Sequence, residues 1–165
     1  MEWSVMTGIG ARIGGGAREG NFWALQLRWG RVLTAPRGSG VLRGSLEYAF
    51  ELVPALVMAQ SNTVFGAGLN PIMLQYNFGG NGSGGRVFPF LQVGSGMLFS
   101  TDDIPAGTAQ FNFTPQGGAG IYWMGADRPS IVFGVRYHHI SNAGRVRPNP
   151  GHNAIYIYGG LAWWR

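Results

Sequence analysis

The sequence contains no cysteine and no lysine. The absence of cysteine excludes a disulfide framework, a thiolate nucleophile and a cysteine-ligated metal site. Charged residues make up only 12% of the 165 residues, about half the share that soluble domains carry. A water-soluble chain of this length would lack the charged side chains that normally cover its surface. We therefore infer that part of the surface faces a solvent other than water.

Long apolar runs are also missing, and none approaches the ~20 residues of a membrane-spanning helix. The opening residues, Met-Glu-Trp-Ser, lack the basic and apolar regions of a signal peptide, so an exported form would have lost its signal from this chain. Glycine is abundant, with 29 residues, but it has no collagen period. The aromatic content of 13% argues against a disordered glycine-rich chain.

The twelve positive charges are all arginine and give a net charge of +5. Two interpretations stay open. One is a genomic codon bias, and the other is a preference for phosphate-bearing partners, which the guanidinium group binds through two parallel hydrogen bonds. Because the basic residues are few and scattered, nucleic-acid binding is disfavoured.

The sequence does contain regular alternation of apolar and polar residues, which is the pattern of strands with two different faces. Between 42 and 52, the even positions are apolar or glycine and the odd positions are polar or small. Clusters of turn-forming residues at 35–40, 79–85 and 125–129 separate such segments. The pattern predicts eight strands, at 2–11, 22–33, 41–54, 63–78, 86–99, 110–123, 130–141 and 153–164.

These strands predict one all-β domain over residues 1–165, an eight-stranded antiparallel up-and-down transmembrane β-barrel. Most of the strands are long enough to cross a bilayer when tilted, and a barrel of about eight strands is filled by its own side chains. The polar faces carry small residues and charges of both signs, which can neutralise one another inside a narrow lumen. The opposite faces are continuously apolar, so we expect them to contact lipid.

An even number of strands places both termini at one end, which is the periplasmic end in outer-membrane barrels. Trp3, Trp123, Trp163 and Trp164 are then expected at this end as an interfacial aromatic girdle. The strand propensity of tryptophan is the alternative explanation. Outer loops are expected near 12–21, 55–62, 100–109 and 142–152.

The most reactive side chains gather near the seventh predicted strand, in His138-His139-Ile140-Ser141-Asn142-Ala143-Gly144. His139 and Ser141 are two residues apart on a strand, so both point to the lipid-facing side. A serine beside an imidazole is the minimum for acyl transfer, because the base removes the hydroxyl proton and then protonates the leaving group. The alternative is a pair of polar residues that marks the end of the strand.

His138 has a different expected role. It points into the lumen, where we expect it to form a hydrogen bond with a carboxylate such as Glu47 or Glu51. Because His138 and His139 face opposite sides of the strand, the histidine cluster does not predict a metal site.

The stretch His139-Ile140-Ser141-Asn142-Ala143-Gly144, followed by Pro148-Asn149-Pro150-Gly151, resembles the signature of the PagL-type lipid A 3-O-deacylases. Glu51-Leu52-Val53-Pro54 adds a weaker similarity. The resemblance implies an eight-stranded barrel of the bacterial outer membrane, with its active site on the lipid-facing wall toward the outer leaflet. It further implies hydrolysis of the ester-linked acyl chain at the 3-position of lipid A, without a metal or an organic cofactor.

The resemblance also implies the role of each matching residue. Ser141 would be the nucleophile, His139 the general base, and Asn142 would help to place or stabilise the oxyanion. Asn153 stands where the family has a glutamate that orients the histidine. An asparagine can hold an imidazole in the required tautomer, but it cannot stabilise the imidazolium by charge.

Arg145 and Arg147 lie in the loop above this site, where they are expected to bind the phosphates of lipid A; a merely soluble polar loop is the alternative. The expected partners are lipopolysaccharide and outer-membrane lipids, and a homo-oligomer or an assembly partner stays open. Asn153 favours a rival function, a non-catalytic barrel that acts as an anchor or assembly subunit. A lipocalin-like soluble carrier is a second rival, whereas a pore is disfavoured because eight strands leave a filled lumen.

Overall fold

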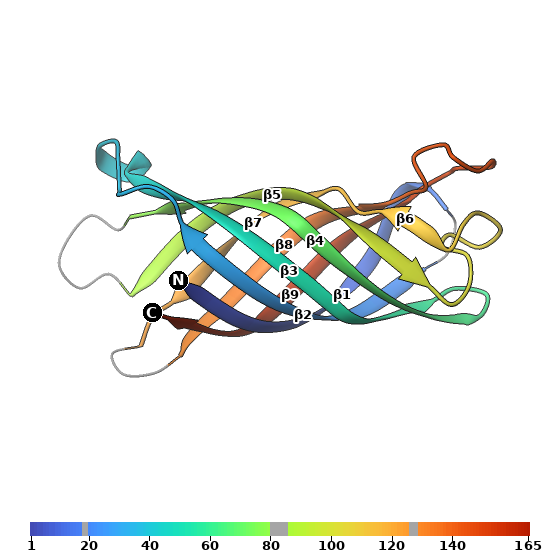
Figure 1. Ribbon diagram of the computed structural model, residues 1–165, viewed down its shortest axis with the longest axis horizontal. Coiled ribbons are helices and arrows are strands. Elements are labelled where there is room, and N and C mark those ends of the chain that lie inside the picture. Colours follow the sequence, from blue (N-terminus) through green and yellow to red (C-terminus); the bar gives the residue numbers. More distant parts are fainter. Residues whose placement is uncertain (18–19, 80–85, 126–128) are drawn as a thin grey trace.

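The computed structural model describes residues 1–17, 20–79, 86–125 and 129–165 (Figure 1). In these ranges the chain forms nine strand segments and one short 3-10 turn, η1 (Gly40–Leu42). The strands are β1 (Glu2–Gly16), β2 (Asn21–Val32), β3 (Gly44–Ala59), β4 (Thr63–Phe78), β5 (Val87–Ser100), β6 (Phe111–Phe113), β7 (Gln116–Trp123), β8 (Ser130–Ile140) and β9 (His152–Trp164). No helix in the described ranges is long and apolar enough to cross a membrane.

The nine segments form a closed barrel of eight antiparallel strands, as the sequence predicted. β1 pairs with β2 on one side and β9 on the other, and β4 pairs with β5, so the described sheet closes on itself. β6 and β7 both pair with β5 and therefore form one interrupted barrel strand. The interruption falls at Thr114 and Pro115, because proline has no N–H to donate to a neighbouring strand.

Two strands extend further than the alternation indicates. β1 continues to Gly16 and β3 continues to Ala59, through segments that we expected to be outer loops. The register shifts between Arg12 and Gly16 in β1, and again in β3 next to Pro54. The glycines and the proline therefore mark irregularities inside long strands rather than their ends.

The two faces of the wall follow the predicted division. Outward positions are mostly apolar and exposed along the long strands, as in Ile9 (61%), Phe65 (56%) and Phe133 (53%). Inward positions are buried and of mixed character: glycines, polar and charged side chains and aromatic rings lie there together with aliphatic side chains such as Met58, Val64 and Leu98. A barrel with an apolar outer wall and a polar interior is the arrangement of a transmembrane β-barrel.

Two buried arginines and three buried glutamates fill the lumen. Arg28 lies 3.4 Å from Glu2, 3.2 Å from Glu47 and 3.0 Å from Glu51. Arg136 lies 2.7 Å from Glu51, which therefore bridges the two guanidinium groups. Buried charges of this kind are tolerated only when paired and hydrogen-bonded, and here each carboxylate accepts from at least one arginine.

His138 faces the lumen as expected, but its expected partner is wrong. Its ring lies 5.3 Å from the ring of Phe22, and its Nδ1 atom has no hydrogen-bond partner among the described residues. Glu47 and Glu51 are occupied by the arginines and by amide side chains. The lumenal carboxylates are thus satisfied without the histidine.

Both chain ends lie at one end of the barrel, here called the terminal end (Figure 1). Trp3 pairs across the sheet with Trp29 and with Trp163, and these three rings lie on the outer wall at one level. Trp123 is also exposed there, whereas Trp164 turns inward and packs edge-on against Tyr122. The girdle therefore contains Trp29 in place of Trp164. The predicted turns at 79–85 and 125–129 lie largely outside the described residues.

Candidate active site

The predicted site lies near the other end of the barrel, here called the outer end, where β8 leaves the wall. His139 and Ser141 both face outward, and His139 is half-buried. Ser141 is only 8% exposed, and it continues the sheet beyond β8: its backbone exchanges two hydrogen bonds with Phe113, at 2.8 and 3.1 Å. The carbonyl of Pro115, at the interruption between β6 and β7, accepts a hydrogen bond from the backbone N–H of His139 at 3.0 Å.

Asn153 determines which ring nitrogen of His139 carries the proton. The amide Nδ2 of Asn153 donates to the carbonyl of Gly15 at 3.1 Å, so the amide oxygen points the other way. That oxygen lies 2.6 Å from Nδ1 of His139. Because an amide oxygen can only accept, the hydrogen must sit on Nδ1 and the neutral ring keeps the lone pair of Nε2.

Tyr137 is a further member of this group that the sequence reasoning missed. Its hydroxyl donates to the same oxygen of Asn153 at 2.7 Å. The two donors, Tyr137 and His139, occupy both lone pairs of the amide oxygen. The signal was available, since Tyr137, His139 and Ser141 alternate on one face of the same strand.

The other edge of the imidazole lies over Gly151. A Cβ atom at Gly151 would be 2.7 Å from Cε1 and 3.3 Å from Nε2 of His139. Ile140 pairs with His152, so the next position along the register places Gly151 opposite Ser141. The Nε2 edge therefore points toward the level of Ser141, although none of the hydrogen bonds among the described residues joins the two side chains.

Replacing Gly151 with alanine is expected to lower the rate of any acyl transfer that this serine and histidine perform roughly tenfold, because the added methyl would displace the imidazole. Gly144→Ala is the matched control: both glycines have positive φ, +66° and +77°, but nothing lies within 4 Å of a Cβ at Gly144. Steady-state rates of the two folded variants test this, and equal losses would show that the backbone conformation, not the imidazole, is responsible.

Asn142 lies beside Ser141, but its side chain is used by the loop. Its Nδ2 donates to the carbonyl of Val146 at 3.1 Å, and its Oδ1 accepts from the Val146 N–H at 3.4 Å. The backbone N–H of Asn142 donates to Oδ1 of Asn149 at 3.3 Å. Asn142 is 1% exposed, so its amide shapes the outer loop directly after the serine.

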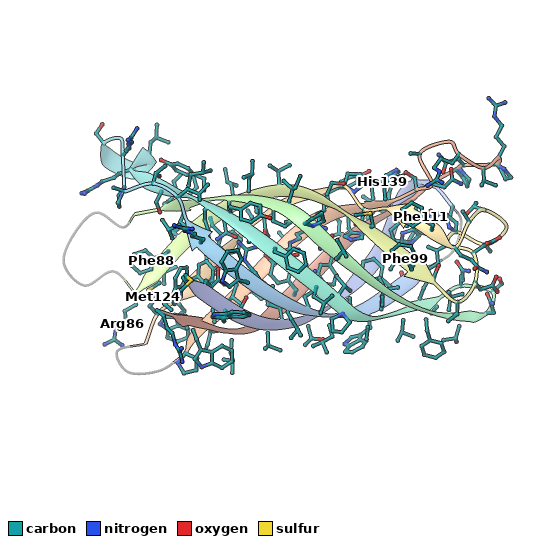
Figure 2. All side chains as sticks on the ribbon, viewed as in Figure 1. Arg86, Phe88, Phe99, Phe111, Met124 and His139 are labelled. Carbon is teal, nitrogen blue, oxygen red and sulfur yellow. The ribbon has the colours of Figure 1, made fainter. Side chains whose placement is uncertain are left out.

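Arg145 and Arg147 lie in the same loop, at the outer end. The guanidinium of Arg145 lies 5.2 Å from the ring centroid of Phe111, in cation–π contact. Phe111 in turn packs against Phe99 at 4.8 Å, on the wall near His139 (Figure 2). Arg147 is exposed. The loop thus holds one arginine against the apolar wall and one in the open.

Carboxylates do not approach His139 in the described part of the chain. Glu47 and Glu51 lie in the lumen, behind the wall. Asp102 belongs to another outer loop, where the N–H of Asp103 and the amide of Asn62 lower the pKa of its carboxyl group. No group of three potential metal ligands occurs among the described residues. The arrangement is therefore a serine, a histidine and an asparagine on the apolar wall.

Comparisons with known proteins agree with the barrel fold. The family model described as lipid A 3-O-deacylase (PagL) matches residues 5–162. A crystal structure of the outer-membrane enzyme PagL has a TM-score of 0.68 and 20% identity, over 98% of this chain and 99% of that one. A crystal structure of Neisserial surface protein A (NspA) has a TM-score of 0.61 and 11% identity, over 98% and 95%. A search of curated protein sequences finds no match.

Proposed function

This chain belongs to the lipid A 3-O-deacylase (PagL) family of the bacterial outer membrane, and on that premise we propose that Ser141 and His139 carry out the deacylation. The substrate is the ester-linked acyl chain at the 3-position of lipid A. The observation that carries the proposal is the hydrogen bond between Nδ1 of His139 and Asn153, because it leaves Nε2 free to act as a base on the side of Ser141.

The reaction proceeds in two acyl transfers. Nε2 of His139 takes the hydroxyl proton of Ser141 while Oγ bonds to the acyl carbon, which gives a tetrahedral oxyanion. When the ester bond breaks, the imidazolium returns the proton to the departing 3-oxygen of lipid A. The acyl-serine is then hydrolysed by water, whose proton passes to the same Nε2 and on to Ser141 Oγ, and the fatty acid is released.

The position on the wall suits this substrate. An amphiphile in the outer leaflet presents its acyl esters at the level where the apolar wall ends, so it need not leave the membrane. In the proposal, Phe99 and Phe111 contact the acyl chain, while Arg145 and Arg147 bind phosphate groups above it. The side chain of Asn142 supports the loop, so its contribution to the oxyanion is positional.

A non-catalytic barrel is the second candidate, and two observations favour it. Ser141 Oγ makes no hydrogen bond to His139 among the described residues, and an amide replaces the family's carboxylate at Asn153. Catalytic hydrogen bonds are often long before substrate binds, so the first observation does not remove the base from reach. The two candidates differ in whether lipid A loses an acyl chain.

The experiment is mass spectrometry of lipid A after incubation of lipopolysaccharide with the refolded protein. We expect the loss of one 3-linked hydroxyacyl mass with the wild type and no loss with Ser141→Ala. Heat-modifiable gel migration confirms that both are folded barrels. An unchanged lipid A mass in both folded samples would favour the structural barrel, and loss in both would exclude Ser141 as the nucleophile.

A further inference from the structure

The formal charges divide unequally along the barrel. At the outer end, the formal charges of the described residues sum to +1. The residues that carry these charges are Arg12, Arg145, Arg147, Asp102 and Asp103. In the lumen the two arginines and three glutamates sum to −1. The pairs Arg18–Glu19 and Asp127–Arg128, outside the described residues, are each neutral. The entire net charge of +5 therefore falls at the terminal end.

Five exposed arginines carry this charge: Arg31, Arg37, Arg43, Arg86 and Arg165. Every ion pair found among the described residues involves Arg28 or Arg136 instead. The described acidic residues toward the terminal end, Glu2 and Glu47, are buried in the lumen. The surface of this end is thus positive, and none of the described aspartate or glutamate side chains is exposed there to neutralise it.

Two of the five arginines lie on the lipid-facing wall. In β2, Arg31 follows Trp29 by two residues on the same outward face, and Arg165 follows Trp163 in the same way beyond β9. Trp29 and Trp163 both pair with Trp3, and the N–H of Arg165 continues the ladder to Met1 at 2.8 Å. The Cα atom of each arginine therefore lies about 7 Å along its strand beyond the tryptophan that precedes it.

A position just beyond the tryptophan girdle is at the depth of the lipid phosphates in a membrane. Tryptophan rings gather at the headgroup boundary of a membrane, so a side chain one step further out reaches the phosphate layer. A guanidinium on an apolar wall is costly unless it meets an anion, and phosphate accepts its parallel N–H groups. In the orientation with Ser141 toward the outer leaflet, these phosphates belong to the inner leaflet.

The turn between β2 and β3 has the composition of a membrane-surface contact as well. Val41 and Leu42 in η1 are 81% and 69% exposed, between Arg37 and Arg43. Figure 1 shows this turn projecting away from the side of the barrel at the terminal end. Exposed apolar side chains flanked by arginines are typical of segments that lie in an anionic lipid interface.

We propose that the wall at the terminal end binds anionic phospholipid head groups of the inner leaflet through Arg31 and Arg165. This surface is about 14 residues along the strands from Ser141, counted on the last strand from Gly151, which lies opposite Ser141, to Arg165, so it is independent of the deacylation chemistry. Binding at this surface anchors the barrel at a fixed depth in the membrane. Because the surface is positively charged, it binds acidic lipid in preference to zwitterionic lipid.

Quenching of tryptophan fluorescence by brominated lipid tests the proposal. Four of the six tryptophans face outward toward the terminal end, where they report on neighbouring lipid: Trp3, Trp29, Trp123 and Trp163. Trp164 lies at the same end but turns inward. The full chain is refolded into phosphatidylcholine vesicles with about 20 mol% phosphatidylglycerol. In one sample the phosphatidylglycerol is brominated, and in the other the phosphatidylcholine is brominated. We expect brominated phosphatidylglycerol to be enriched around the wild type about fivefold or more per wall arginine.

Arg31→Gln is expected to lower this enrichment about fivefold, and Arg31→Gln with Arg165→Gln is expected to bring it close to that of phosphatidylcholine. Arg86→Gln is the matched control. It removes one positive charge from the same end, but Arg86 precedes β5 at the mouth of the barrel, beside Phe88 and Met124 (Figure 2), and we expect it to retain the enrichment.

Two results would overturn the proposal. Equal quenching of the wild type by the two brominated lipids would show that the terminal end does not select anionic lipid. An equal loss in Arg31→Gln and Arg86→Gln would show that overall charge, rather than a site on the wall, attracts the lipid. Deacylase activity is not needed for the measurement, so failure of the proposed function leaves its outcome interpretable.

Discussion

Replacing Asn153 with glutamate is expected to raise the rate of lipid A deacylation about a hundredfold, because it supplies the charge that the amide lacks. The amide oxygen already orients His139, at 2.6 Å from Nδ1. The imidazolium that forms during acyl transfer nevertheless meets no carboxylate among the described residues around it. At the boundary of the membrane, where the effective dielectric constant is low, a negative charge beside the ring stabilises that intermediate strongly.

Single-turnover rates on purified lipid A in mixed micelles measure this gain. Asn153→Asp is the matched control, since aspartate has the shape of asparagine but places an oxygen where Nδ2 now donates to the Gly15 carbonyl at 3.1 Å. The two oxygens repel, so aspartate is expected to turn away and to gain less than glutamate. A glutamate variant no faster than the wild type would contradict the assignment of Asn153 as the partner that limits the base.

Replacing Glu51 with leucine is expected to destabilise the barrel by about 3–5 kcal/mol, because two buried guanidinium groups would lose their shared carboxylate. Glu51 is completely buried and accepts hydrogen bonds from Arg28, Arg136 and Asn70. Without it, Arg136 has only amide oxygens as acceptors among the described residues. The measurement is the urea dependence of unfolding in lipid vesicles, followed by tryptophan fluorescence.

The double variant Glu51→Leu with Arg136→Met separates lost pairing from lost packing. Arg28 keeps Glu2 and Glu47 as partners, so removing both members of the other pair leaves no arginine unpaired and the formal charge of the lumen unchanged. We expect the double variant to recover most of the stability, since apolar replacements of a buried pair are often neutral. Similar losses in the single and double variants would mean that side-chain volume, not charge pairing, accounts for the effect.

The alternation of residues was sufficient to predict the barrel, because the pleat forces neighbours to opposite faces whatever the partner strand is. It could not predict partners across the lumen. Arg28 in β2 and Arg136 in β8 meet at Glu51 only after closure brings β2, β3 and β8 around one interior. Composition likewise could not predict that β1 continues through the glycines at 14–16. Gly15 and Gly16 have positive φ, and glycine allows this conformation in a bulge as well as in a turn.

The candidate site likewise has one part that the sequence predicts and one part that depends on the folded barrel. His139 and Ser141 were placed on one face by their spacing alone, and the pairing of β8 with β9 brings Asn153 to His139 as the resemblance implied. The same alternation places Tyr137 on this face, but its hydrogen bond to Asn153 depends on that pairing. The amide orientation of Asn153 depends on a carbonyl more than 130 residues away in the sequence, which no local pattern contains.

The contact between Gly15 and Asn153 also depends on closure of the barrel. β1 and β9 are the first and last strands, and their pairing is the seam at which the cylinder closes. Before the seam forms, the amide of Asn153 is free to rotate, and the imidazole beside it is free to exchange tautomers. The geometry that leaves Nε2 of the proposed base free is therefore expected to be complete only when β1 and β9 have paired.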